Sequence, residues 1–309
     1  MKSLKIGNIK LKNPLFLAPM VEVTDLPYRL ICRKAGAAMA YTEMFYISQI
    51  LHENKKTQNL MKTSKKDKPI GIQITGNTPE EFRKVIPYVK PYSLIDINCG
   101  CPSLTITGNQ AGSYLLKHPE KISQMIKILK EADLTVTAKI RLGFKKNNVL
   151  KVSKAIEKAG ADALTLHARL ATHGRSIPAN WKWIKKVKKS IGIPLIGNGD
   201  IFTGPDVEKM LEITDGAMLA RAVIGDPLIF TRILKYLKTK KEPLFNFKKN
   251  IKSFQEYLKL AKKYNLIDIP RIKYLGSNFI KNTQGASKIR NKLMQLKSFE
   301  EVESFIKSI

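Results

Sequence analysis

Between residues 15 and 237, eight short apolar segments alternate with segments whose apolar residues recur at helical spacing. This alternation is the pattern expected of repeated βα units around a parallel sheet. Eight units favour a closed TIM (β/α)8 barrel, in the α/β class, over an open doubly wound sheet. The expected strands are 15–18, 38–42, 70–74, 94–97, 135–140, 163–166, 194–196 and 216–219.

Helices are expected between these strands, and several open with a proline in the first turn. The clearest are 79–89, 119–130, 149–158 and 205–211. After residue 237 the polar run 238–243 indicates a linker, and no further strand is expected. Amphipathic segments at 247–264, 271–283 and 286–296 indicate a small helical bundle. We therefore predict two domains, a barrel over 1–237 and a C-terminal helical bundle over 238–309.

The chain is strongly basic, with 55 Lys and Arg against 25 Asp and Glu and a net charge of +30. Such a charge attracts polyanions and makes their binding salt-dependent, so nucleic acid is the first candidate partner. A compositional preference for lysine would also produce many basic residues, but it does not explain so few acidic ones. The C-terminal segment 239–309 carries 16 basic and 6 acidic residues and is the more densely charged part.

The three cysteines, Cys32, Cys99 and Cys101, are too few and too clustered for a disulfide framework. The pair Cys99 and Cys101 lacks the spacing and the partner ligands of a zinc site, so we expect reduced thiols and no metal. Residues 1–12 lack the apolar run of a signal peptide, and no run of about 18 apolar residues occurs. We expect a cytoplasmic protein that does not span a membrane.

Polar residues end nearly every expected strand. In a barrel of this kind the reaction site lies at the C-terminal ends of the strands. A single polar residue there has an ordinary structural explanation, but burying several together costs free energy unless a ligand or mutual bonding satisfies them. A polar cofactor is the economical explanation. The strand-end residues are Pro19, Met20, Glu43, Gln73, Asn98, Cys101, Lys139, Arg141, His167, Arg169, Asn198, Gly199, Asp200, Ala220 and Arg221.

The last two strands are followed by glycine-containing turns, where such barrels often bind phosphate. Glycine lets backbone N–H groups approach phosphate oxygens, and Arg221 adds a bidentate donor. Gln73, Lys139 and His167 can face a heteroaromatic ring from neighbouring strands. Flavin mononucleotide (FMN) therefore fits better than a bare phosphate.

The turn after the fourth expected strand brings an amide and two thiols to one point. Asn98 ends the apolar run, and Gly100 and Pro102 force the backbone to turn where Cys101 appears. A soluble chain rarely needs this arrangement for packing alone. We interpret this turn as part of the edge of an active site.

Together these residues resemble the tRNA-dihydrouridine synthase family, and the resemblance extends over nearly the whole chain. Arg271 and the segment 285–290 resemble the helical C-terminal domain of that family. The matching motifs are Ala18-Pro19-Met20, Thr42-Glu43-Met44, Asp96-Ile97-Asn98, Gly100-Cys101-Pro102, 139–143, His167-Ala168-Arg169, 197–200 and Asp226-Pro227.

The resemblance implies an FMN-dependent oxidoreductase that reduces the C5=C6 bond of specific uridines in tRNA, with NADPH or NADH as electron donor. Hydride would pass from flavin to C6, and Cys101 would give a proton to C5. Asn98 and Arg141 would hold the uracil. His173, in the loop after the sixth strand, is either a further substrate contact or an exposed loop residue. The basic bundle would contact the rest of the tRNA.

The flavin contacts that the resemblance implies come from most of the strand ends. Cys99 would be a small buried residue without a catalytic role. The flavin contacts are Pro19, Met20, Gln73, Lys139, His167, Asn198, Gly199, Asp200, Ala220 and Arg221.

Two other functions compete with this one. A flavin barrel acting on a free pyrimidine, like the dihydroorotate dehydrogenases, would use similar chemistry but would not need a lysine-rich helical appendage. An RNA-binding protein that has lost catalysis would not need to retain Cys101 and the flavin contacts.

Overall fold

The computed structural model describes residues 4–281 and 283–309. Eight parallel strands form one sheet in the order β3-β10-β9-β8-β7-β6-β5-β4. A parallel bridge between Phe16 and Met39 joins the two ends of this sheet, and Leu17 N–H donates to Met39 O at 2.9 Å. The predicted closed barrel is therefore confirmed. Its strands are β3 Leu15–Leu17, β4 Ala40–Tyr46, β5 Ile70–Thr75, β6 Leu94–Cys99, β7 Val136–Arg141, β8 Ala163–His167, β9 Leu195–Asn198 and β10 Gly216–Leu219.

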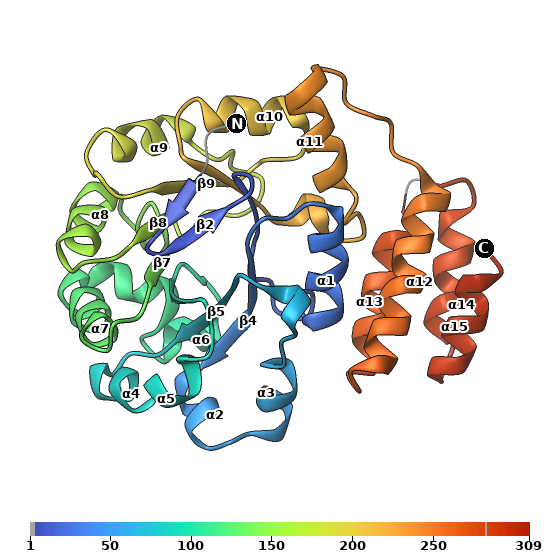
Figure 1. Cartoon of the computed structure of the whole chain (residues 1–309), viewed down its shortest axis with the longest axis horizontal. Helices are drawn as coiled ribbons and strands as arrows, with labels where there is room; N and C mark the ends of the chain where they lie inside the picture. The colour runs from blue at the N-terminus through green and yellow to red at the C-terminus, as the bar shows by residue number, and fades with distance from the viewer. Residues whose placement is uncertain (1–3, 282) are drawn as a thin grey trace.

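Helices surround the barrel (Figure 1). The predicted helices 119–130, 149–158 and 205–211 are confirmed with small shifts at their ends. The predicted helix 79–89 is divided at Val85, because Pro87 has no N–H to donate to the preceding turn. The helices are α1 Leu26–Ala35, α2 Ile47–Leu51, α3 Lys55–Leu60, α4 Pro79–Lys84, α5 Ile86–Val89, α6 Leu104–Gly108, α7 Pro119–Glu131, α8 Val149–Lys158, α9 Trp181–Lys188, α10 Gly204–Leu211 and α11 Ile229–Thr239.

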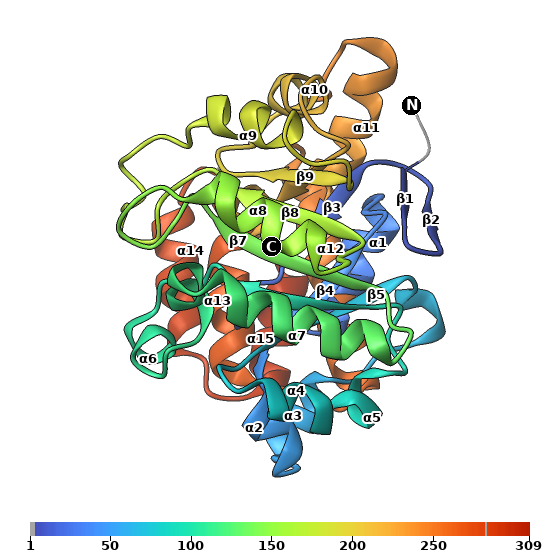
Figure 2. The same cartoon turned by 90° about the vertical axis from the view of Figure 1, so that its left-hand side faces the viewer.

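A short antiparallel hairpin of β1 (Leu4–Ile6) and β2 (Ile9–Leu11) covers the N-terminal end of the barrel. Leu4, Ile6 and Leu11 are buried in one cluster with barrel residues such as Phe16 and Met218. Figure 2 shows the hairpin at one end of the barrel and α6, which follows β6, at the other. The hairpin was not predicted from the sequence.

The C-terminal segment is helical, as expected, and its helices lie side by side next to α1 (Figure 1). They are α12 Phe247–Lys263, α13 Ile269–Phe279, α14 Ala286–Gln295 and α15 Phe299–Lys307. Helix α15 was not predicted; Ser298 and Glu301 form a reciprocal capping box at its start. Helix α13 covers less of 271–283 than expected, but starts earlier because Asp268 caps it and Pro270 occupies its first turn.

A buried polar cluster joins the C-terminal helices to the barrel. Arg271 of α13 lies 2.6 Å from Glu43 of β4 and 3.4 Å from Asp25, the residue that caps α1. The Tyr257 hydroxyl donates to Asp25 at 3.0 Å. Apolar residues of both parts also share one core cluster. Over the part of the chain that the structure describes, no helix has the length and apolar character needed to cross a membrane.

Candidate active site

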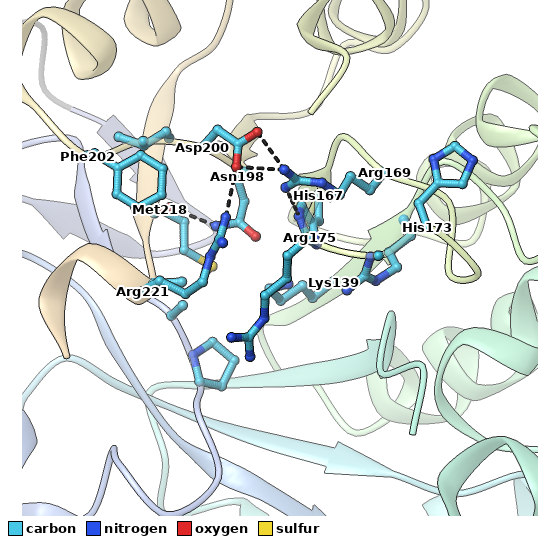
Figure 3. Close-up of a pocket in the computed structure, with 17 residues that line it drawn as sticks. Lys139, His167, Arg169, His173, Arg175, Asn198, Asp200, Phe202, Met218 and Arg221 are labelled. Carbon is cyan, nitrogen blue, oxygen red and sulfur yellow. Dashed lines mark hydrogen bonds and ion pairs between the residues drawn. The ribbon is translucent and has the colours of Figure 1, made fainter. Parts of the chain in front are cut away.

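A cavity opens at the C-terminal ends of β3 and of β7 to β10 (Figure 3). Most of the strand-end residues singled out in the sequence line it. Arg169, Arg175 and Phe202 line it as well and were not among the predicted contacts. The predicted residues that line it are Pro19, Lys139, Arg141, His167, His173, Asn198, Gly199, Asp200, Ala220 and Arg221.

Positive charge dominates this cavity. Among the described residues that line it, Asp200 is the single carboxylate. Arg169 donates to both Asp200 oxygens at 2.7 and 2.6 Å, and Arg221 donates to Oδ1 at 2.8 Å. Although burial raises the pKa of Asp200, hydrogen bonds from Arg169 and Ala179 and the neighbouring positive charges lower it below its usual value. Asp200 thus orients two guanidinium groups, and the cavity keeps a positive potential suited to an anion.

His167 is neutral in this surrounding. Burial and then the charge of Lys139 are the leading causes that lower its pKa to about 2. Burial, followed by the charge of Arg141, lowers the pKa of Lys139 to about 8. The cavity therefore offers a neutral imidazole and an amine near its titration point at physiological pH, on adjacent strands.

The backbone at Gly199 approaches its neighbours closely. Its φ is +113°, and an added Cβ would lie 2.9 Å from His167 Cδ2 and 3.0 Å from Ala179 Cβ. Asn198, the preceding residue, donates its amide to Met218 O at 2.8 Å. Glycine at 199 thus lets the backbone pass close to the imidazole, where a side chain would clash.

The turn that carries Cys101 lies beside the cavity and is linked to it by Arg141. Arg141 lines the cavity, and its Nε donates to Gly100 O at 2.8 Å. Asn98 pairs laterally with Lys139 in the sheet. Gln73, Asn98 and Cys101 do not line the cavity themselves, but they occupy its β5 and β6 side.

The three thiols differ in access. Cys101 is partly exposed, whereas Cys32 and Cys99 are buried. Burial raises the pKa of Cys99 well above that of an ordinary thiol. Cys99 is therefore a packing residue, as expected, and Cys101 is the thiol that a ligand can reach.

Two predicted residues lie differently from the rest. Met20 follows Pro19 but does not line the cavity; its carbonyl accepts from the Thr24 N–H at 3.0 Å and so closes a turn. His173 lines the cavity rim, and Figure 3 shows its ring pointing away from the pair of Arg169 and Asp200.

Arg169 was singled out as a polar residue after the sixth strand but was given no contact, whereas Arg175 and Phe202 were missed. Arg175 and Phe202 lie in loops, where no periodicity indicates direction. Figure 3 shows Arg175 pointing into the cavity, and the Arg221 guanidinium lies 5.3 Å from the centre of the Phe202 ring.

Known proteins resemble this chain over most of its length. The family model described as "Dihydrouridine synthase (Dus)" matches residues 16–308. A probable tRNA-dihydrouridine synthase of Aquifex aeolicus is 35% identical over 263 residues, which cover 82% of this chain and 81% of that protein. The tRNA-dihydrouridine synthase B of Pasteurella multocida is 34% identical, over 80% of this chain and 78% of that protein. A probable tRNA-dihydrouridine synthase 1 of Synechocystis is 32% identical, over 97% of this chain and 87% of that protein.

Solved structures resemble the fold at low sequence identity. An old yellow enzyme homologue from Zymomonas mobilis matches with a TM-score of 0.53 and 11% identity, over 79% of this chain and 93% of that one. A 2-naphthoyl-CoA reductase complex matches with a TM-score of 0.58 and 15% identity, over 76% of this chain and 52% of that one. These matches agree with the barrel architecture.

Proposed function

This chain belongs to the dihydrouridine synthase family, and we propose that it reduces the C5=C6 bond of specific uridines in tRNA. The observation that carries the proposal is the pairing of a cationic strand-end cavity with an accessible thiol, Cys101, on the adjoining turn. The relatives named as tRNA-dihydrouridine synthases support the substrate.

The residues of the cavity fit FMN. Arg221, which Asp200 orients and which is partly exposed, is suited to a phosphate group, and the backbone at Gly199 has no room for a Cβ. Lys139 and the neutral His167 provide polar contacts for a heteroaromatic ring. When bound there, FMN supplies the hydride that C6 of the uracil accepts, with NADPH or NADH as the source of electrons.

Cys101 provides the proton. A thiol can donate to C5 only while it is protonated and held near that carbon, and the turn before Pro102 restricts its position. The side-chain oxygen of Asn98 accepts two backbone N–H groups, and its amino group donates one hydrogen to Gln73 Oε1. The second amino hydrogen of Asn98 is left for a uracil carbonyl. Arg141 lines the cavity and donates to Gly100 O in the turn, and it is the second uracil contact.

The rest of the tRNA contacts the basic surface. Bases in folded RNA are stacked, so the target uridine must turn out into the cavity, most cheaply from an unpaired loop. We assign residues 1–237 to FMN binding and catalysis and residues 238–309 to tRNA phosphate contacts, in a cytoplasmic enzyme. The net charge of +30 supports the polyanionic partner.

One comparison of variants tests this function. The purified protein should be yellow, and NADPH or NADH should bleach its flavin. Cys101→Ala should keep the flavin and its reduction but lose dihydrouridine formation on unmodified tRNA, measured by mass spectrometry of digested RNA. Cys99→Ala is the matched control, because Cys99 is buried, and it should stay active. A colourless protein that takes up no added FMN, or a fully active Cys101→Ala, would contradict the proposal.

A further inference from the structure

Four buried side chains from three adjacent strands form a single file of hydrogen bonds that ends at Cys101. Thr137 Oγ1 donates to Asp96 Oδ1 at 2.7 Å, and Gln73 Nε2 donates to Asp96 Oδ2 at 2.6 Å. Asn98 Nδ2 then donates to Gln73 Oε1 at 2.8 Å. Asn98 Oδ1 accepts the N–H groups of residues 100 and 101 at 3.0 and 2.9 Å. The file therefore runs from β7 through β6 and β5 to the turn of the proposed proton donor.

At both ends of this file, the direction of the hydrogen bond is fixed. An ionised carboxylate can only accept, so Gln73 must turn its amino group toward Asp96. The Gln73 oxygen then faces Asn98, which must present its own amino group and keep its oxygen for the turn. Backbone N–H groups can only donate, so the turn requires an oxygen at that place. A reversed amide at Gln73 would reverse Asn98 and set its amino group against two N–H donors.

The file ends in the side-chain oxygen that binds the N–H groups of residues 100 and 101. Asp96 and Gln73 are each 1% exposed, and Asn98 is 7% exposed, so water cannot replace a lost partner. On the other side, Cys101 O accepts the backbone N–H of Ser113 at 2.9 Å. Arg141 Nε also donates to Gly100 O at 2.8 Å, but the N–H of Cys101 itself is bound by Asn98, so the position of Cys101 responds to the amide orientation of Asn98.

We propose that Asp96 is a positioning residue for Cys101, which it reaches by fixing the orientation of two successive amides. This inference rests on the proposed role of Cys101 as the acid, and it assigns a task to a carboxylate that does not line the cavity. Asp96 touches neither substrate nor cofactor in this account. Its task is to keep an acceptor facing Gln73.

Two substitutions of Asp96 separate its acceptor from its charge. Asp96→Asn keeps an oxygen toward Gln73, because its amino group can donate to the Thr137 hydroxyl, which can turn to accept. Asp96→Leu keeps the same number and branching of side-chain heavy atoms and has no acceptor. Both variants remove the negative charge near Lys139, so any effect of that charge is the same in the two. The Asn variant is therefore the matched control.

The first readout is the alkylation of Cys101 by iodoacetamide in the full-length holoenzyme, followed by peptide mass spectrometry. The other two cysteines are buried, so the labelling reports this turn. Asp96→Leu should label faster than the parent, because the turn is no longer held, whereas Asp96→Asn should label at the parent rate. If Asp96→Leu does not fold, Asp96→Asn combined with Thr137→Val should behave as the Leu variant, because the Asn amino group then has no acceptor.

The second readout divides the reaction into its two halves. Flavin reduction by NADPH should stay near the parent rate in Asp96→Leu, while single-turnover reduction of uridine in tRNA should fall about 100-fold, the scale expected for a misplaced catalytic group. Asp96→Asn should restore it. Equal losses in both half-reactions, or an Asn variant as damaged as the Leu variant, would show that Asp96 is only structural. If Cys101→Ala proves active, the proposed acid is wrong, and the labelling rates still decide whether Asp96 positions the turn.

Discussion

Removing the positive charge of Arg271 should destabilise the protein in a pH-dependent way. Arg271 lies between Glu43 at 2.6 Å and Asp25 at 3.4 Å, with all three side chains buried. Burial raises the pKa of Glu43 and of Asp25, and the charge of Arg271 opposes that rise in both. Without the guanidinium, a buried carboxylate would lose its main compensation.

The substitution Arg271→Met keeps most of the side-chain stem and removes the charge. At pH 7 at least one of the two carboxyls must then take up a proton, which costs about 4 kcal/mol for a group that normally titrates near pH 4. This agrees with the loss of about 3–5 kcal/mol typical of a broken buried ion pair. The folded variant binds more protons than its unfolded chain, so its stability should rise as the pH falls. At pH 5 the loss should shrink by about 2.7 kcal/mol.

Urea unfolding followed by far-UV circular dichroism at pH 7 and pH 5 measures both values. The double variant with Glu43→Gln and Arg271→Met should recover much of the lost stability at pH 7, because one of the two carboxyls is gone. A loss of the same size at both pH values, or no recovery in the double variant, would refute this electrostatic reasoning in favour of simple loss of packing.

Three further outcomes are expected. Gly199→Ala should weaken FMN binding in a fluorescence titration, because its φ is +113° and its Cβ would crowd His167, whereas Gly108→Ala, with no atom near its Cβ, should bind as the parent. Burial raises the pKa of Asp96 to about 6, above its value in the unfolded chain, so the free energy of unfolding should fall as the pH rises from about 4 to 6. Asp96→Asn should abolish that fall and should be more stable than the parent at pH 7 by about 3 kcal/mol, measured by chemical unfolding. The affinity for tRNA should fall steeply between 50 and 200 mM salt in filter binding, and a salt-independent affinity would count against phosphate contacts.

The barrel was predictable because its pattern is repeated and local. The eight strands of the barrel lie within a few residues of the expected positions, and the closure of the sheet into a barrel was expected from the number of strands. The N-terminal hairpin was missed because each of its strands has three residues, too few to show a period. Pro87 explains why one expected helix is two, and that signal was present in the sequence.

The candidate site was predictable to the level of strand ends. In a parallel barrel all C-terminal ends meet on one face, so polar residues there converge, as Lys139 and Arg221 do. Which partner each side chain chooses depends on contacts between strands, and these leave no local trace. Asp200 illustrates this: it was expected at the cofactor, and the structure shows its oxygens held by Arg169 and Arg221.

Glu43 joins parts of the molecule that are far apart in the sequence. One of its oxygens holds Arg271 in α13, and the other accepts the backbone N–H of Glu22, in the loop that continues from Pro19. A ligand of the C-terminal helices that displaced α13 would therefore act on a carboxylate that also holds the loop at the cavity. Coupling of this kind would be reciprocal: a ligand in the cavity would change the affinity for a ligand of the C-terminal helices by the same factor by which the second ligand changes the affinity for the first. Glu43 is the carboxylate through which the two binding events would be linked.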